Sequence, residues 1–102
     1  MGLNQTGTLM DKEYPMVRVT WRDAQDGETG WQPIENILAH DIAICQEVGW
    51  MVSFDARRVV IMRSRVVEDT LREGGAHIAI PRDWLQRIEV LEPTSIWETD
   101  TA

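Results

Sequence analysis

Four arginines lie close together in a stretch of sequence that contains no acidic residue. They are Arg57, Arg58, Arg63 and Arg65, and they give residues 56–67 four positive charges in a chain whose formal net charge is −7. Guanidinium groups bind phosphate oxygens through paired hydrogen bonds. The alternative is that the first two arginines lie in a solvated turn and that the last two pair with acidic side chains. The chain has 17 Asp and Glu, which favours the second interpretation.

Tryptophan is frequent for a chain of this size, with five residues in 102. An exposed indole stacks on nucleic acid bases or binds a partner protein, whereas a buried indole fills the core. Trp50 lies on the more apolar side of a predicted strand, so we expect it in the core. Trp31 and Trp84 lie beside predicted turns, and we expect them at an interface or at the rim of the core.

The residues that could perform catalysis or bind a metal are scattered along the sequence. His40, Cys45 and His77 have neither the spacing of a metal site nor an activating neighbour for a nucleophile. We therefore expect Cys45 to be a small packed thiol. The sequence predicts no catalytic residues, no metal and no cofactor, and thus a protein that is not an enzyme.

Length and composition indicate one acidic folded domain. The chain has 102 residues, 43% of them hydrophobic and 26% charged, which is enough for an ordinary core. Its acidic balance argues against a general polyanion binder. A single Cys excludes an intrachain disulfide, and no apolar run has the length of a membrane span. We predict a flexible N-terminal arm at 1–13, a folded domain at 14–92 and an acidic C-terminal tail at 93–102.

The pattern of apolar residues predicts mainly strands. Residues 16–21 form one β-branched run, and residues 41–54 alternate between apolar even positions and smaller or polar odd positions. The even positions are therefore predicted to face the core. A rival reading extends one helix from Pro33 to Cys45, with Gly49 ending it. We favour a short helical turn at 33–39 followed by the strand, because the alternation continues through Gly49.

The rest of the chain predicts three more strands. Residues 55–57 form a tight reversal, residues 58–67 a strand that is apolar on both faces, and residues 77–80 and 87–91 the last two, with Ile88 and Val90 inward. Gly49 permits the sharp bend that so long a strand needs. The predicted fold is all-β: a five-stranded small Sm/SH3-like barrel, with a short helical segment before the long bent strand.

Two motifs resemble those of the Sm/Lsm family, which includes the Hfq proteins. Residues 49–55 followed by 59–62 resemble its bent strand, Phe-Asp turn and apolar strand, and residues 80–88 resemble its second motif. The resemblance implies self-association through edge-strand pairing. It also implies binding of RNA or single-stranded DNA, with Asp55, Arg58 and Arg82 as the nucleic-acid-binding residues.

The chain also resembles small uncharacterised proteins of tailed bacteriophages. The similar letters are Val19 to Asp23, Gly30-Trp31, Val48 to Trp50 and Ile80 to Arg82. We therefore predict a non-catalytic binding or assembly module of phage-like origin that forms homo-oligomers. It is expected in the cytoplasm, which includes the host cytoplasm, or on the virion, and no membrane partner is expected. The alternative is an RNA- or single-stranded nucleic-acid-binding protein.

Overall fold

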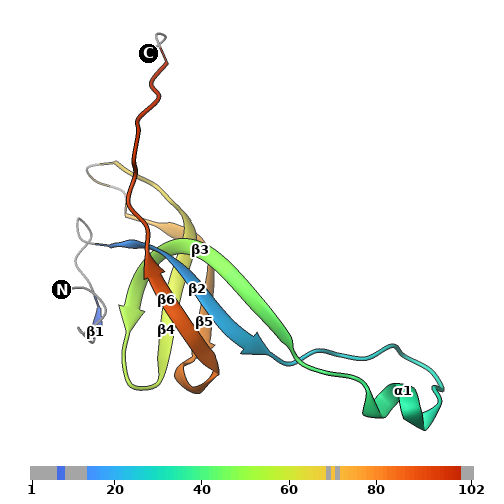
Figure 1. Cartoon of the computed structure of the whole chain (residues 1–102). Helices are drawn as coiled ribbons and strands as arrows, with labels where there is room; N and C mark the ends of the chain where they lie inside the picture. The colour runs from blue at the N-terminus through green and yellow to red at the C-terminus, as the bar shows by residue number, and fades with distance from the viewer. Residues whose placement is uncertain (1–6, 9–13, 69, 71, 100–102) are drawn as a thin grey trace.

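The computed structural model describes residues 7–8, 14–68, 70 and 72–99, and within them the chain is mostly β (Figure 1). The elements are β1 (Gly7–Thr8), β2 (Met16–Asp23), α1 (Ile34–Leu38), β3 (Ala43–Phe54), β4 (Arg58–Arg65), β5 (Gly74–Pro81), the 3-10 turn η2 (Arg82–Trp84) and β6 (Leu85–Val90). Each predicted strand and the helical turn are present, with bounds that differ by a few residues. Apart from β1, the predicted N-terminal arm lies outside the described residues.

All strands belong to one antiparallel sheet, in the order β5-β4-β3-β2-β6, with β1 beside the end of β3. Strands β5 and β6 lie at opposite edges of this sheet, although only the three residues of η2 join them. Four residue steps span at most about 14 Å, whereas four strand spacings in a flat sheet span about 19 Å. The sheet must therefore curl until its two edges approach each other. The described residues contain no ladder between β5 and β6, so the sheet is open along this seam.

The inner face of β3, which covers the core, is formed by odd positions as far as Met51 and then by Phe54. The predicted orientation is therefore wrong for most of this strand. Val19 of β2 is fully buried and lies opposite Glu47, and Val17 lies opposite Gly49. Residues directly opposite in an antiparallel pair project to the same face. The buried residues of β2 therefore place the odd positions of β3 inside and leave Ile44 exposed on the outside.

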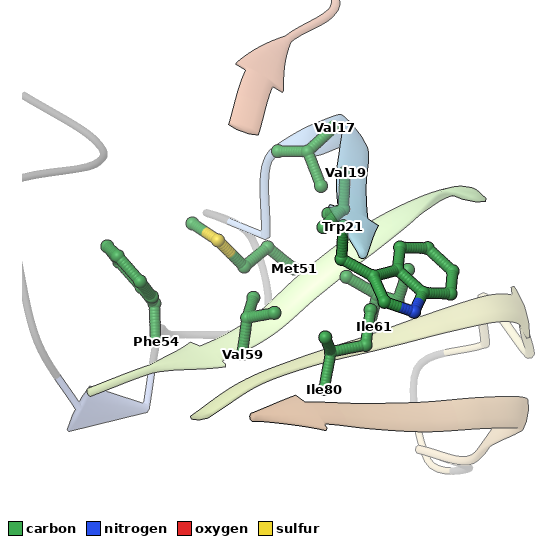
Figure 2. Packing of buried hydrophobic residues seen from close by; sticks show 8 residues of the cluster. All are labelled: Val17, Val19, Trp21, Met51, Phe54, Val59, Ile61 and Ile80. Carbon is green, nitrogen blue, oxygen red and sulfur yellow. The ribbon is translucent and has the colours of Figure 1, made fainter. Parts of the chain in front are cut away.

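The core is a small cluster contributed by four neighbouring strands (Figure 2). Its members are Val17, Val19, Trp21, Met51, Phe54, Val59, Ile61 and Ile80, with Cys45, Ile78, Leu85 and Ile88 packed against it. A shift in register between Met51 and Ser53 turns Phe54 to the inner face. Full burial of one such aliphatic or aromatic side chain stabilises the fold by about 1.5–3 kcal/mol.

The inward prediction is wrong for Trp50 and confirmed for Val90. Trp50 is only half-buried and lies on the outer face, where the Arg65 guanidinium is 5.7 Å from its ring. Its even position in β3 explains this outcome. Val90 lies opposite Val17 on the inner face but stays 40% exposed, because it lies at the end of an edge strand.

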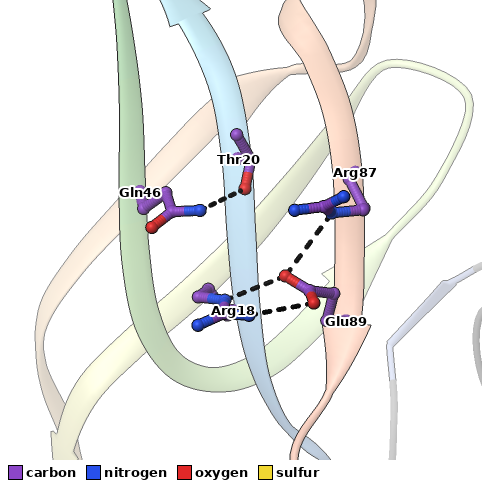
Figure 3. Close-up of polar contacts among 5 residues, drawn as sticks. All are labelled: Arg18, Thr20, Gln46, Arg87 and Glu89. Atoms are coloured by element: carbon purple, nitrogen blue, oxygen red, sulfur yellow. Dashed lines mark hydrogen bonds and ion pairs between the residues drawn. The ribbon is translucent and has the colours of Figure 1, made fainter.

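Polar contacts connect β3, β2 and β6 across the outer face (Figure 3). Arg18 donates two hydrogen bonds to the carboxylate of Glu89, at 2.8 and 2.9 Å, and Arg87 lies 3.5 Å from the same carboxylate. Gln46 Nε2 donates to Thr20 Oγ1 at 3.1 Å. Such partly exposed contacts contribute little energy each, but they fix the edge strand β6 beside β2.

Residues 24–42, which we call the projecting arm, leave the sheet between β2 and β3 and carry α1 near their far end (Figure 1). The arm is one reason for the radius of gyration of 18.0 Å, since a compact chain of this length has about 13 Å. Helix α1 has five residues, none of them buried. In the described part of the chain no helix has the length and apolarity needed to cross a membrane.

Replacing Gly49 should destabilise the fold. A Cβ at this position would lie 2.6 Å from the backbone carbonyl oxygen of Met62 on β4. We expect Gly49→Ala to lower the free energy of unfolding by about 1–3 kcal/mol, because overpacking forces the strands apart. Urea unfolding followed by tryptophan fluorescence measures this loss. The control is Gly75→Ala, whose Cβ would meet nothing within 4 Å; an equal loss in both variants would contradict the steric explanation.

Candidate functional site

The turn between β3 and β4 is built around the carboxylate of Asp55. Its Oδ1 accepts hydrogen bonds from the backbone N–H groups of Arg57, at 2.8 Å, and Arg58, at 3.0 Å. The backbone N–H of Asp55 donates to the carbonyl of Arg58 at 3.0 Å. The two backbone donors and the nearby guanidinium groups hold the pKa of the Asp55 carboxyl below its ordinary value. The aspartate therefore fixes a tight turn in which two arginines follow each other.

The side chain of Arg82 extends from η2 to this turn. Its Nη1 donates to the backbone carbonyl of Asp55 at 2.9 Å, and its guanidinium carbon lies 4.5 Å from the centre of the Phe54 ring. The backbone N–H of Arg82 donates to the carbonyl of Arg57 at 2.8 Å. A cation over an aromatic face is attracted by the ring quadrupole. These contacts attach the connection between the two sheet edges to the β3–β4 turn.

The structure brings together all three residues that the sequence singled out. Arg58 Nη1 lies 3.4 Å from Asp55 Oδ2, and Arg82 contacts the backbone of the same aspartate. They are 27 positions apart at most in the sequence, so the curl of the sheet is what makes them neighbours. Arg58 pairs with the Asp55 carboxylate, whereas Arg82 contacts a backbone carbonyl and the Phe54 ring.

A hollow of about 320 Å³ lies beside this cluster, and we call it the Arg82 pocket. Its lining residues are Phe54, Arg82, Leu85, Gln86, Arg87 and Ile88. Three of the six are apolar, two are arginines and none is acidic. The pocket thus combines an apolar lining with a cationic rim, which suits a ligand that carries both an apolar group and a negative charge.

The sequence analysis left two interpretations for the arginines of residues 56–67: phosphate binding, or a solvated turn together with pairing to acidic side chains. Arg63 donates two hydrogen bonds to the carboxylate of Glu47, so it is a paired arginine as expected. Arg65 instead lies over the rings of Tyr14 and Trp50, at 5.8 and 5.7 Å. Arg57 is exposed in the turn. The four side chains therefore do not form one phosphate clamp.

Cys45 and His40 have separate local roles. The Cys45 thiol packs against the core and lies 3.9 Å from the carboxylate of Asp23. Burial, followed by the negative charge of Asp23, raises the pKa of this thiol and so disfavours the nucleophilic thiolate. His40 Nε2 lies 2.8 Å from the carbonyl of Gln25 within the projecting arm. Among the described residues, no three His, Cys, Asp or Glu side chains are grouped so as to bind a metal.

The feature that sequence reasoning missed is the apolar surface of the projecting arm. Trp31 is fully exposed, and Ile34, Ile37 and Leu38 are each more than half exposed. Ile44 and Val48, on the outer face of β3, are also about half exposed. The sequence contained a signal for this surface. Residues 24–42 contain four acidic residues and no Lys or Arg, so the apolar residues of this segment have only negatively charged neighbours along the chain.

The Asp55 turn should make stability depend on pH in the acid range. Because the folded state lowers the pKa of Asp55, its carboxylate stabilises the fold above the ordinary pKa, and that stabilisation is lost as pH falls through the folded value. We expect Asp55→Asn to lower the urea midpoint at neutral pH. The difference from the parent chain should shrink as the pH falls below the ordinary pKa of an aspartate. A difference that is the same at every pH would contradict the role assigned to the charge.

Comparisons of the chain with models of protein families, with curated proteins and with solved structures found no match. The site is therefore defined by its geometry. It consists of the Asp55 turn, the arginines around it and the adjacent Arg82 pocket, together with an exposed apolar arm on the same chain.

Proposed function

We propose that this chain is a non-catalytic assembly module whose copies bind one another. The observation that carries the proposal is the projecting arm, whose large apolar side chains are exposed while its backbone is ordered into a turn of helix. The Sm-like type of barrel and the phage-like origin, both inferred from sequence motifs, belong to the same proposal.

The energetics of the arm support association. An isolated helix of five residues is too short to be stable in water, and α1 buries none of its side chains against the sheet. Burying one Ile or Leu side chain contributes about 1.5–3 kcal/mol. Contiguous exposed apolar surface on a folded protein typically marks a binding surface. A partner that covers the arm would supply the stabilisation that the rest of the chain does not.

The two sheet edges support association of like copies. β5 and β6 each have one edge without a strand partner in the described ladder. Such an edge presents unpaired N–H and C=O groups that another strand satisfies. The unpaired N–H and C=O groups of β5 in one copy can pair with those of β6 in the next. Such pairing would extend the curled sheet from one subunit into its neighbour.

Removing the apolar side chains of α1 should reduce the assembly. We expect size-exclusion chromatography with light scattering to give the unmodified chain a mass that is a multiple of 11.7 kDa. The variant with Ile34→Ser and Leu38→Ser should shift toward the mass of one chain, because neither residue is buried in the subunit and the fold remains intact. Circular dichroism checks that fold.

The matched control is Val67→Ser, which removes an exposed apolar side chain outside the arm. It should leave the mass unchanged. An unmodified chain that elutes as a single copy at all concentrations would contradict the proposed function.

One observation favours a second function, binding of RNA or single-stranded DNA. The residues that the Sm resemblance implies, Asp55, Arg58 and Arg82, converge beside the aromatic ring of Phe54. Arginine and an aromatic ring side by side provide both phosphate contacts and base stacking. The net charge of −7 opposes this function, so we place it second.

Nucleic-acid binding would show a strong dependence on salt. If it occurs, the association constant for oligo-U, measured by fluorescence anisotropy, should fall with added salt because counterions are released. Arg58→Ala should then reduce the slope of the log–log salt plot by about one, whereas Arg22→Ala on β2 should leave it unchanged. The absence of binding at low salt would eliminate this second function.

A further inference from the structure

We infer that the projecting arm of one copy docks in the Arg82 pocket of a second copy. This inference rests on the proposed self-association and assigns to it a donor surface and an acceptor surface. The donor is the arm, with the apolar and acidic side chains around α1. The acceptor is the pocket beside the Asp55 turn.

The two surfaces carry opposite charges. Residues 24–42 contain Asp26, Glu28, Glu35 and Asp41 and no Lys or Arg. The lining of the Arg82 pocket contains two arginines and no acid, and the Asp55 turn beside it adds the exposed Arg57. Complementary charge accelerates encounter between protein surfaces and fixes their register. Two acidic arms repel each other, and so do two arginine-lined pockets. Contact between an arm and a pocket is therefore favoured over contact between two arms.

The two surfaces also complement each other in apolar character. The pocket is lined by Phe54, Leu85 and Ile88 and has a volume of about 320 Å³, and about 150 Å³ is enough for a benzene-sized group. Helix α1 presents Ile34 and Leu38, both exposed, with Glu35 between them. Aliphatic side chains from α1 would fill the pocket while Glu35 meets its cationic rim.

A second hollow on the sheet fits the arm less well. It is lined by Tyr14, Arg65, Arg72 and Glu73 among others, and so contains an acid that would repel the arm. The guanidinium of Arg65 already lies over the rings of Tyr14 and Trp50. A further hollow lies in the projecting arm itself, where Gly27, Ile37 and His40 line it.

The shape of the subunit directs the arm to another copy. Figure 1 shows the arm leading away from the curled sheet, with α1 at a distance from the β5–β6 connection. An arm that binds a different surface on a second copy makes a heterologous contact. Such contacts repeat from copy to copy, and they close into a ring or continue as a filament.

Charge reversal tests the pairing of the two surfaces. Glu35→Arg reverses the charge of the arm, and Arg87→Glu reverses a charge at the pocket. Arg87 is largely exposed and lies 3.5 Å from the Glu89 carboxylate, which Arg18 continues to bind in this variant. We expect each single variant to raise the self-dissociation constant about tenfold, measured by sedimentation velocity in 0.1 M salt, because close charge pairs couple this strongly. The combined variant should return to within about threefold of the unmodified chain, since charges within about 10 Å still interact at this salt concentration.

The control combines Glu35→Arg with Arg22→Glu, which makes the same change of charge on β2 outside the pocket. This combination should remain as weak as Glu35→Arg alone. Equal circular dichroism spectra and urea midpoints establish that all variants fold. An unmodified chain that stays a single copy would overturn both the proposed function and this inference. Assembly that is insensitive to the reversals, or that the combined variant does not restore, would overturn only the inference.

Discussion

The short connection between β5 and β6 is the constraint on which the rest of the structure depends. Three residues join strands at opposite edges of a five-strand path, so the sheet has to curl around its apolar face. Arg82 fixes this connection through the backbone of Arg57, the carbonyl of Asp55 and the ring of Phe54. The same contacts that enclose the core therefore also create the cationic site and the pocket beside it.

Much of the fold followed from local patterns in the sequence. Period-two alternation located β3, the β-branched run located β2, and Pro33 followed by apolar residues indicated the turn of helix that becomes α1. Asp55, Arg58 and Arg82, which the sequence singled out as nucleic-acid-binding residues, lie close together in the structure. Local patterns succeed here because strands, turns and short helices are determined mainly by neighbouring residues.

Local sequence patterns could not predict which face of β3 points toward the core. Ile44 and Val48 are the more apolar choice for a core, yet they face outward, because the register with Val17 and Val19 decides which side is covered. Pairing between distant strands is information that alternation along one strand does not contain. The apolar residues left outside by this register, and those of the projecting arm, are the surface on which the proposed function depends.

The unequal lengths of two connections have a consequence for how the chain folds. Three residues separate β3 from β4, whereas the 19 residues from 24 to 42 separate β2 from β3. Closing the longer loop costs about 1.6 kcal/mol more in chain entropy, at roughly 0.6 kcal/mol per doubling of length. The β3–β4 hairpin, closed by the Asp55 turn, therefore forms at a smaller entropic cost and offers a template on which β2, and then β6, can pair. We therefore expect the hairpin around Asp55 to be the first part of the sheet to form during folding.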